Sequence, residues 1–180
     1  MDELEEKLLA LDKRRGKRKV ASVSEHCRRN EAFDVLIDMF PTSSPRRRGS
    51  ISWVLLHALQ KRRWKPLIGH AERLCKVLAA EREDTMCKRC LMSFFQAGPL
   101  PVEHLGLLAD SSIRLLKDRK ESLAVRAFSI SVLMRLAEDF PELYQEVEEE
   151  LSLMAGHDKP SIRVRARKAI LRMDKISSKG

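Results

Sequence analysis

Apolar residues recur every three or four positions along almost the whole chain, and they seldom alternate with polar residues as they would in strands. The repeated stripes predict helices within residues 20–27, 33–40, 51–59, 67–78, 86–94, 102–115, 121–139, 143–154 and 162–173. Pro41, for example, ends the stripe that finishes at Phe40. We therefore predict an all-α protein.

The segment 121–139 is apolar on two opposite sides when its residues are placed 100° apart. One side holds Leu123, Ala127, Ile130 and Met134, and the other holds Val125, Phe128, Val132 and Leu136. A helix that is apolar on both sides has to be covered on both sides. This pattern predicts stacked layers of helices, because a helix of a simple bundle needs only one apolar face.

Three prolines support the layered arrangement. Pro66, Pro101 and Pro141 each stand where a new stripe begins, which is a favoured first-helical position, and they are 35 and 40 residues apart. The triplet at 125–127, Val-Arg-Ala, recurs 39 residues later at 164–166. A period of this length predicts an α-solenoid of about four HEAT- or armadillo-like antiparallel helix pairs, with an ordinary helical bundle as the alternative.

Several packing motifs resemble those of a known family. They are Ser50-Ile51-Ser52-Trp53-Val54-Leu55, the prolines at the second helices, and the closing stretches 124–143 and 163–171. Over about residues 20–173 the chain resembles small HEAT-repeat proteins of bacterial, especially Bacteroidetes-type, genomes. The resemblance implies a fold and no activity. On this basis residues 20–176 are expected to form the repeat domain, and residues 1–19 a flexible basic leader.

Charge is distributed unevenly along the 180 residues, which carry 35 Lys and Arg against 26 Asp and Glu, a net charge of +9. Residues 121–150 hold 8 acids and 2 bases, whereas residues 151–180 hold 8 bases and 2 acids. We expect these two blocks to pair with each other if they form adjacent helices. The uncompensated positive charge then lies in residues 1–120.

Basic clusters of this kind can contact a phosphate backbone, and an aromatic residue among them can stack on a base. The candidate nucleic-acid-binding residues are Arg46, Arg47, Arg48, Lys61, Arg62, Arg63, Trp64, Lys65, Arg165, Lys168 and Arg172. The alternative is that they form solvated helix faces, with the basic stripe of the last helix paired to the acidic helix before it. Trp53, by contrast, is expected in the core.

Candidate chemistry is sparse. Cys87 and Cys90 form a CxxC motif, but Cys90 falls on an apolar stripe, so we expect a core residue and neither a metal site nor a cofactor. The five histidines show no motif that links them to a nucleophile, and no glycine cluster precedes a helix. The sequence therefore predicts a protein that is not an enzyme.

The remaining features concern location and partner. Four cysteines are too few for a disulfide scaffold, and no apolar run approaches the ~18 residues of a membrane span, so we expect a cytoplasmic protein without a membrane partner. The preferred hypothesis is non-enzymatic binding of a protein or peptide on a solenoid surface. The alternative is sequence-independent nucleic-acid binding. Weaker still is an activity like that of HEAT-like DNA glycosylases, whose catalytic pattern cannot be placed in this sequence.

Overall fold

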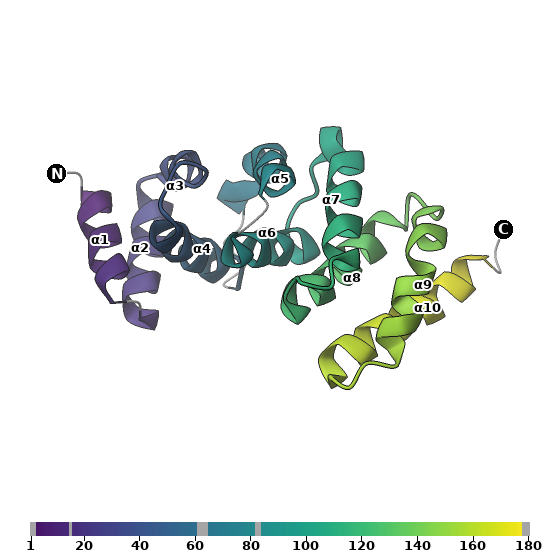
Figure 1. The fold of residues 1–180 in the computed structure, drawn as a ribbon. Helices are drawn as coiled ribbons and strands as arrows, with labels where there is room; N and C mark the ends of the chain where they lie inside the picture. Colours follow the sequence, from purple (N-terminus) through teal and green to yellow (C-terminus); the bar gives the residue numbers. More distant parts are fainter. Residues whose placement is uncertain (1–2, 15, 61–64, 82–83, 178–180) are drawn as a thin grey trace. The chain divides into compact units, whose positions relative to one another are not determined.

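The computed structural model describes residues 3–14, 16–60, 65–81 and 84–177, and these residues contain helices and no strand (Figure 1). The helices are α1 (Glu3–Lys13), α2 (Lys17–Arg29), α3 (Phe33–Met39), α4 (Pro45–Gln60), α5 (Ala71–Ala80), α6 (Thr85–Ala97), α7 (Leu105–Lys117), α8 (Leu123–Leu136), α9 (Leu143–Ala155) and α10 (Pro160–Ser177), with short 3₁₀ helices η1 (Lys65–His70) and η2 (Val102–His104). The predicted all-α class is confirmed in this part of the chain.

The chain divides into two compact units, which we describe separately. Unit 1 comprises Met1–Val102 and unit 2 comprises Glu103–Gly180. In unit 1, α1 packs against α2, and α5 packs against α6. In unit 2, α7 packs against α8, and α9 packs against α10. These eight helices thus pair with a neighbour in sequence, as HEAT-type repeats require.

The beginning of unit 1 differs from the flexible leader expected over residues 1–19. Residues Glu3–Lys13 form α1, and its Leu4, Leu8 and Leu11 are buried against the helices it contacts, α2 and α4. These leucines are four and three residues apart, so they form one apolar stripe. The basic run that follows these leucines favoured the prediction of a flexible leader, and the apolar stripe was therefore missed.

The centre of unit 1 is a layer in which α4 packs against both α2 and α6. The α4 side chains Ile51, Val54 and Leu55 are at most 2% exposed. Small residues allow the helices to approach closely, and the Cys90 thiol of α6 lies 3.5 Å from the Ser52 carbonyl oxygen of α4. On α6, Phe94 and Phe95 meet edge to face, with ring centroids 5.1 Å apart.

Helix α8 in unit 2 is buried on both of its apolar sides. It packs against α7 and against α10. Val132 and Leu136 on one side are at most 1% exposed, and Ala127 and Ile130 on the other side are at most 3% exposed. The two-sided burial predicted from the sequence is confirmed, and it explains why this helix can carry apolar residues around most of its circumference.

Charge pairing in unit 2 follows the expected pairing of the acidic and basic blocks only in part. Two glutamates of α9 contact bases of α7 and α8: Glu150 lies 2.5 Å from Arg126, and Glu146 lies 3.7 Å from Lys117. Helix α10 sends Arg172 to Glu138, just beyond α8, and donates a hydrogen bond from Arg167 to the Ala155 carbonyl at the end of α9. The ion pair between Arg172 and Glu138 therefore links the two charge blocks, whereas Glu146 and Glu150 of α9 pair with bases outside the basic block.

We predict that Val132→Asp lowers the free energy of unfolding of the full chain by about 3–5 kcal/mol, because it places an unpaired carboxylate in a fully buried layer. Urea denaturation followed by circular dichroism measures the change. Leu153→Asp is the control, because Leu153 is 53% exposed on α9 of the same unit. Equal stability of the two variants would show that this side of α8 is not a core layer.

Candidate functional site

Helices α4 and α6 run parallel, and two contacts at different levels establish this. Near the start of α4, Arg48 Nη1 lies 2.7 Å from Glu81 Oε2 and 3.9 Å from Asp84 Oδ2. Asp84 is the N-cap of α6, where its side chain accepts hydrogen bonds from the Met86 and Cys87 amides. Further along both helices, Ser52 meets Cys90. The two N-termini are therefore neighbours.

This arrangement places Trp53 and Arg89 on one face of the α4–α6 layer. Trp53 follows Ser52, and Arg89 precedes Cys90, so the 100° step of each helix turns both side chains to the same side, away from the core. Trp53 is 40% exposed, and Arg89 is exposed. Neither side chain has a hydrogen bond or ion pair within the described part of the chain.

We call this surface the Trp53–Arg89 face, and its exposed or half-exposed side chains include Arg46, Trp53 and Gln60 of α4 with Arg89, Ser93 and Gln96 of α6. The expectation that Trp53 is a core residue was wrong. Ile51 and Leu55 line the core side of α4, and Trp53 stands two residues from each, about 200° around the helix. The sequence already contained this signal, because Trp53 lies off the apolar stripe.

Arg89 also differs from the other arginines found in the first two turns of α4, α8 and α10. Arg48 is bound by Glu81, Arg126 is bound by Glu150, and the Arg165 guanidinium lies 5.2 Å from the centre of the Phe128 ring. Each of these three fastens its helix to a neighbour. Arg89 has no such partner in the described residues, so its charge is available to a ligand.

The run Arg46–Arg48, a nucleic-acid-binding candidate, is engaged inside unit 1. Arg46 donates hydrogen bonds to the Asp12 and Lys13 carbonyls at the end of α1. Arg47 lies 2.5 Å from Asp12 and 3.0 Å from Glu5. Burial alone would lower the pKa of Arg47, but its hydrogen bonds to the two carboxylates outweigh burial and raise that pKa. Carboxylates therefore compensate Arg47 and Arg48.

The other candidates are spread over different surroundings. Lys61, Arg62, Arg63 and Trp64 lie outside the described residues, and Lys65 is described only as the first residue of η1. In unit 2, Arg165 covers Phe128, Arg172 pairs with Glu138, and Lys168 is exposed. The described candidates of each unit thus form no continuous row of uncompensated cations.

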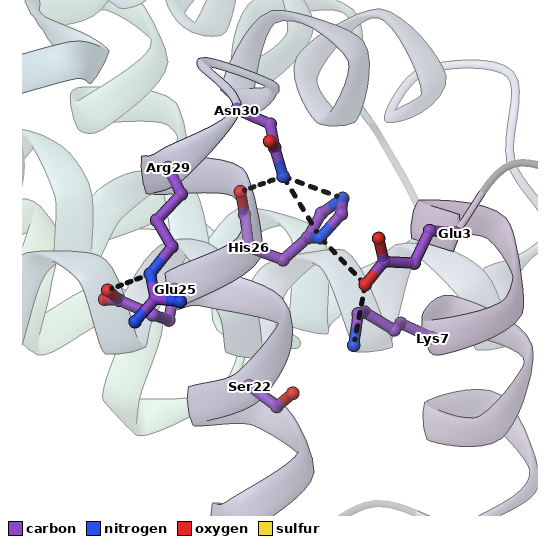
Figure 2. Close-up of a pocket in the computed structure, with 7 residues that line it drawn as sticks. All are labelled: Glu3, Lys7, Ser22, Glu25, His26, Arg29 and Asn30. Carbon is purple, nitrogen blue, oxygen red and sulfur yellow. Dashed lines mark hydrogen bonds and ion pairs between the residues drawn. The ribbon is translucent and has the colours of Figure 1, made fainter.

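An open cavity of about 370 Å³ lies between α1 and α2 (Figure 2). Its polar lining consists of Glu3, Lys7, Ser22, Glu25, His26, Arg29 and Asn30. Glu3 Oε1 lies 3.4 Å from His26 Nδ1 and 3.3 Å from Lys7 Nζ, so the lining groups largely bind one another. These contacts attach α1 to α2 and leave no convergent set of groups for a substrate.

The four cysteines are buried free thiols. Burial raises the pKa of Cys27 and of Cys90 to about 12 and that of Cys75 to about 11, and it also raises the pKa of Cys87. Thiolate is therefore scarce at neutral pH. Among the residues that the structure describes, no group of His, Cys, Asp or Glu could hold a metal ion.

The family model of the HEAT repeat domain matches residues 8–173, so the chain belongs to the HEAT repeat family. No curated protein and no solved structure matches the chain. The match includes the second half of α1, in agreement with the packing of this helix on α2. Among the described helices, none combines the length and apolarity needed to cross a membrane.

We predict that the native protein reacts with a thiol reagent such as DTNB at pH 8 at least about 100-fold more slowly than the urea-unfolded protein. The reason is that all four thiols are buried and their pKa values lie well above the ordinary value. Absorbance at 412 nm follows the reaction. One or more thiols reacting at the unfolded rate in the native state would contradict the burial described here.

Proposed function

We propose that this protein is a non-enzymatic binding protein that holds a protein or peptide partner on the Trp53–Arg89 face. The carrying observation is the exposure of Trp53 beside Arg89, which has no hydrogen bond or ion pair among the residues that the structure describes. Tryptophan and arginine are the residues most enriched among those that dominate binding energy at protein interfaces. HEAT repeats present their stacked helices as such binding surfaces.

The described residues support a binding role better than catalysis. The cysteines are buried with raised pKa values, and the carboxylates around Arg47 and Arg48 are engaged in ion pairs. The narrower resemblance to HEAT-repeat proteins of Bacteroidetes-type genomes brings no activity with it. The proposal places the protein in the cytoplasm, in keeping with its four free thiols.

Nucleic-acid binding is the second candidate function, and net charge is what favours it. Tight binding to a phosphate backbone needs several cations that release counterions together. On the α4–α6 layer, however, acids compensate Arg47 and Arg48. A glycosylase-like activity would additionally need a catalytic acid on this face, and α4 and α6 contain no Asp or Glu.

We predict that Trp53→Ala reduces partner capture at least about 10-fold, as expected for loss of a central interface residue. The full chain is immobilised and exposed to nuclease-treated lysate of the source cells, and retained proteins are quantified by mass spectrometry. Lys76→Ala is the matched control, because Lys76 is exposed in the same unit but lies on α5, which contributes no residue to the Trp53–Arg89 face.

Capture by the wild type, Lys76→Ala and Trp53→Ala distinguishes the possible binding modes. A partner retained by the wild type and by Lys76→Ala, and lost from Trp53→Ala, supports the proposal. A partner that is retained from untreated lysate and lost after nuclease treatment favours nucleic-acid binding. Partners retained equally by all three proteins would mean that the Trp53–Arg89 face is not the docking surface. Circular dichroism of each variant checks that the helical fold is intact.

A further inference from the structure

We infer that the segment docked on the Trp53–Arg89 face is acidic, with a carboxylate that binds Arg89 and an apolar side chain that packs on Trp53. This inference rests on the proposed function and specifies the chemistry of the partner. A guanidinium binds a carboxylate through two parallel hydrogen bonds, and such charge-assisted bonds are stronger than neutral ones. An exposed indole provides a rigid apolar surface next to it.

The charge of the surface carries the inference. Helices α4 and α6 contain no Asp or Glu, whereas each of the other α-helices of unit 1 contains at least one. The carboxylates that do approach α4 are held by Arg47 and Arg48. The exposed charged groups that remain on the face, Arg46 and Arg89, are both cationic. An acidic segment is therefore complementary in charge to the Trp53–Arg89 face, and a basic segment is repelled by it.

The number of cations without a partner in the described part of the face fits a short peptide better than a nucleic-acid backbone. Arg46 already donates hydrogen bonds to two carbonyls of α1, which leaves Arg89 as the cation without a partner in the described part of the face. One such cation suits one carboxylate. A nucleic acid would gain little from it, because its affinity depends on neutralising several phosphates together.

The spacing of the two helices sets the spacing of the recognised groups. Ser52 and Cys90 are in contact, so Trp53 and Arg89 stand at nearly the same level of adjacent helices. Packed helix axes are about 8–10 Å apart, and a segment in the polyproline II conformation advances about 3.1 Å per residue with three residues per turn. A carboxylate three residues from an apolar side chain therefore lies on the same side of such a segment, about 9 Å away, and both groups reach the face. The uncharged Ser93 and Gln96 lie on the same face of α6 and can bond the peptide backbone.

The test uses a synthetic 12-residue peptide in which Glu and Leu stand three residues apart in a Gly/Ser background. Two matched peptides carry Gln or Lys in place of Glu, and a 20-nucleotide oligo-dT represents single-stranded nucleic acid. The protein is the full chain with Trp64→Phe, so that Trp53 is its single tryptophan and its fluorescence reports occupancy of the face. Titrations are made at 150 mM salt.

We expect the Glu peptide to bind with a Kd of about 100 μM or tighter, the Gln peptide about 3- to 10-fold more weakly, and the Lys peptide more weakly still. Arg89→Gln should weaken the Glu peptide by the same factor and leave the Gln peptide unchanged. Lys76→Gln, which removes one exposed charge from α5, should leave all affinities unchanged within about 2-fold, because Lys76 does not belong to the Trp53–Arg89 face and 150 mM salt screens exposed charges.

Equal binding of the Glu and Lys peptides, no binding of the Glu peptide, or Arg89→Gln without effect on it would overturn the inference. Oligo-dT that binds more tightly than the Glu peptide, with loss on Arg89→Gln, would assign the face to nucleic acid. If the peptides fail while Trp53→Ala still abolishes capture of a protein partner, the acidic chemistry is wrong and the proposed docking face stands.

Discussion

Unit 1 depends on three consecutive arginines at the start of α4. Because successive residues of a helix point 100° apart, Arg46, Arg47 and Arg48 reach out in different directions. Arg46 and Arg47 bind the carbonyls and carboxylates of α1, and Arg48 binds Glu81 and the N-cap Asp84 at the start of α6. The first turn of α4 thereby fixes the positions of a helix on either side of it.

This constraint determines which charges remain for a ligand. A run of arginines that resembles a phosphate-binding cluster in the sequence is largely neutralised by residues about 35 positions away. Arg126 has the same role in α8, where it donates a hydrogen bond to the Leu116 carbonyl and pairs with Glu150. Arg89, at the corresponding part of α6, has no partner in the described residues, and it lies beside the exposed Trp53. The candidate site thus contains Arg89, whereas Arg48 and Arg126 bind neighbouring helices.

The sequence predicted the features that depend on local periodicity. The helices and the two buried sides of α8 follow from the spacing of apolar residues, and the repeat follows from the spacing of the prolines and of a recurring triplet. The structure confirms the helical class and the burial of α8, and the family match confirms the HEAT-type repeat. The pairing of charges could not be predicted in the same way. Whether Arg47 faces solvent or Glu5 depends on how α1 packs. Residues 1–19 were expected to form a flexible leader, so this packing was not predicted. The exposure of Trp53 was predictable from its position off the apolar stripe, but the general preference for buried tryptophan outweighed that signal.

The structural role of the α4 arginines can be measured as the free energy of unfolding of Arg47→Met. The substitution keeps much of the side-chain volume but leaves Glu5 and Asp12 without their arginine, and Asp12 Oδ1 is already a buried oxygen without a hydrogen bond. The account predicts a loss of about 1–3 kcal/mol in urea denaturation, against no more than about 0.5 kcal/mol for Lys76→Met, with affinity for oligo-dT unchanged. Unchanged stability of Arg47→Met together with weaker oligo-dT binding would contradict it.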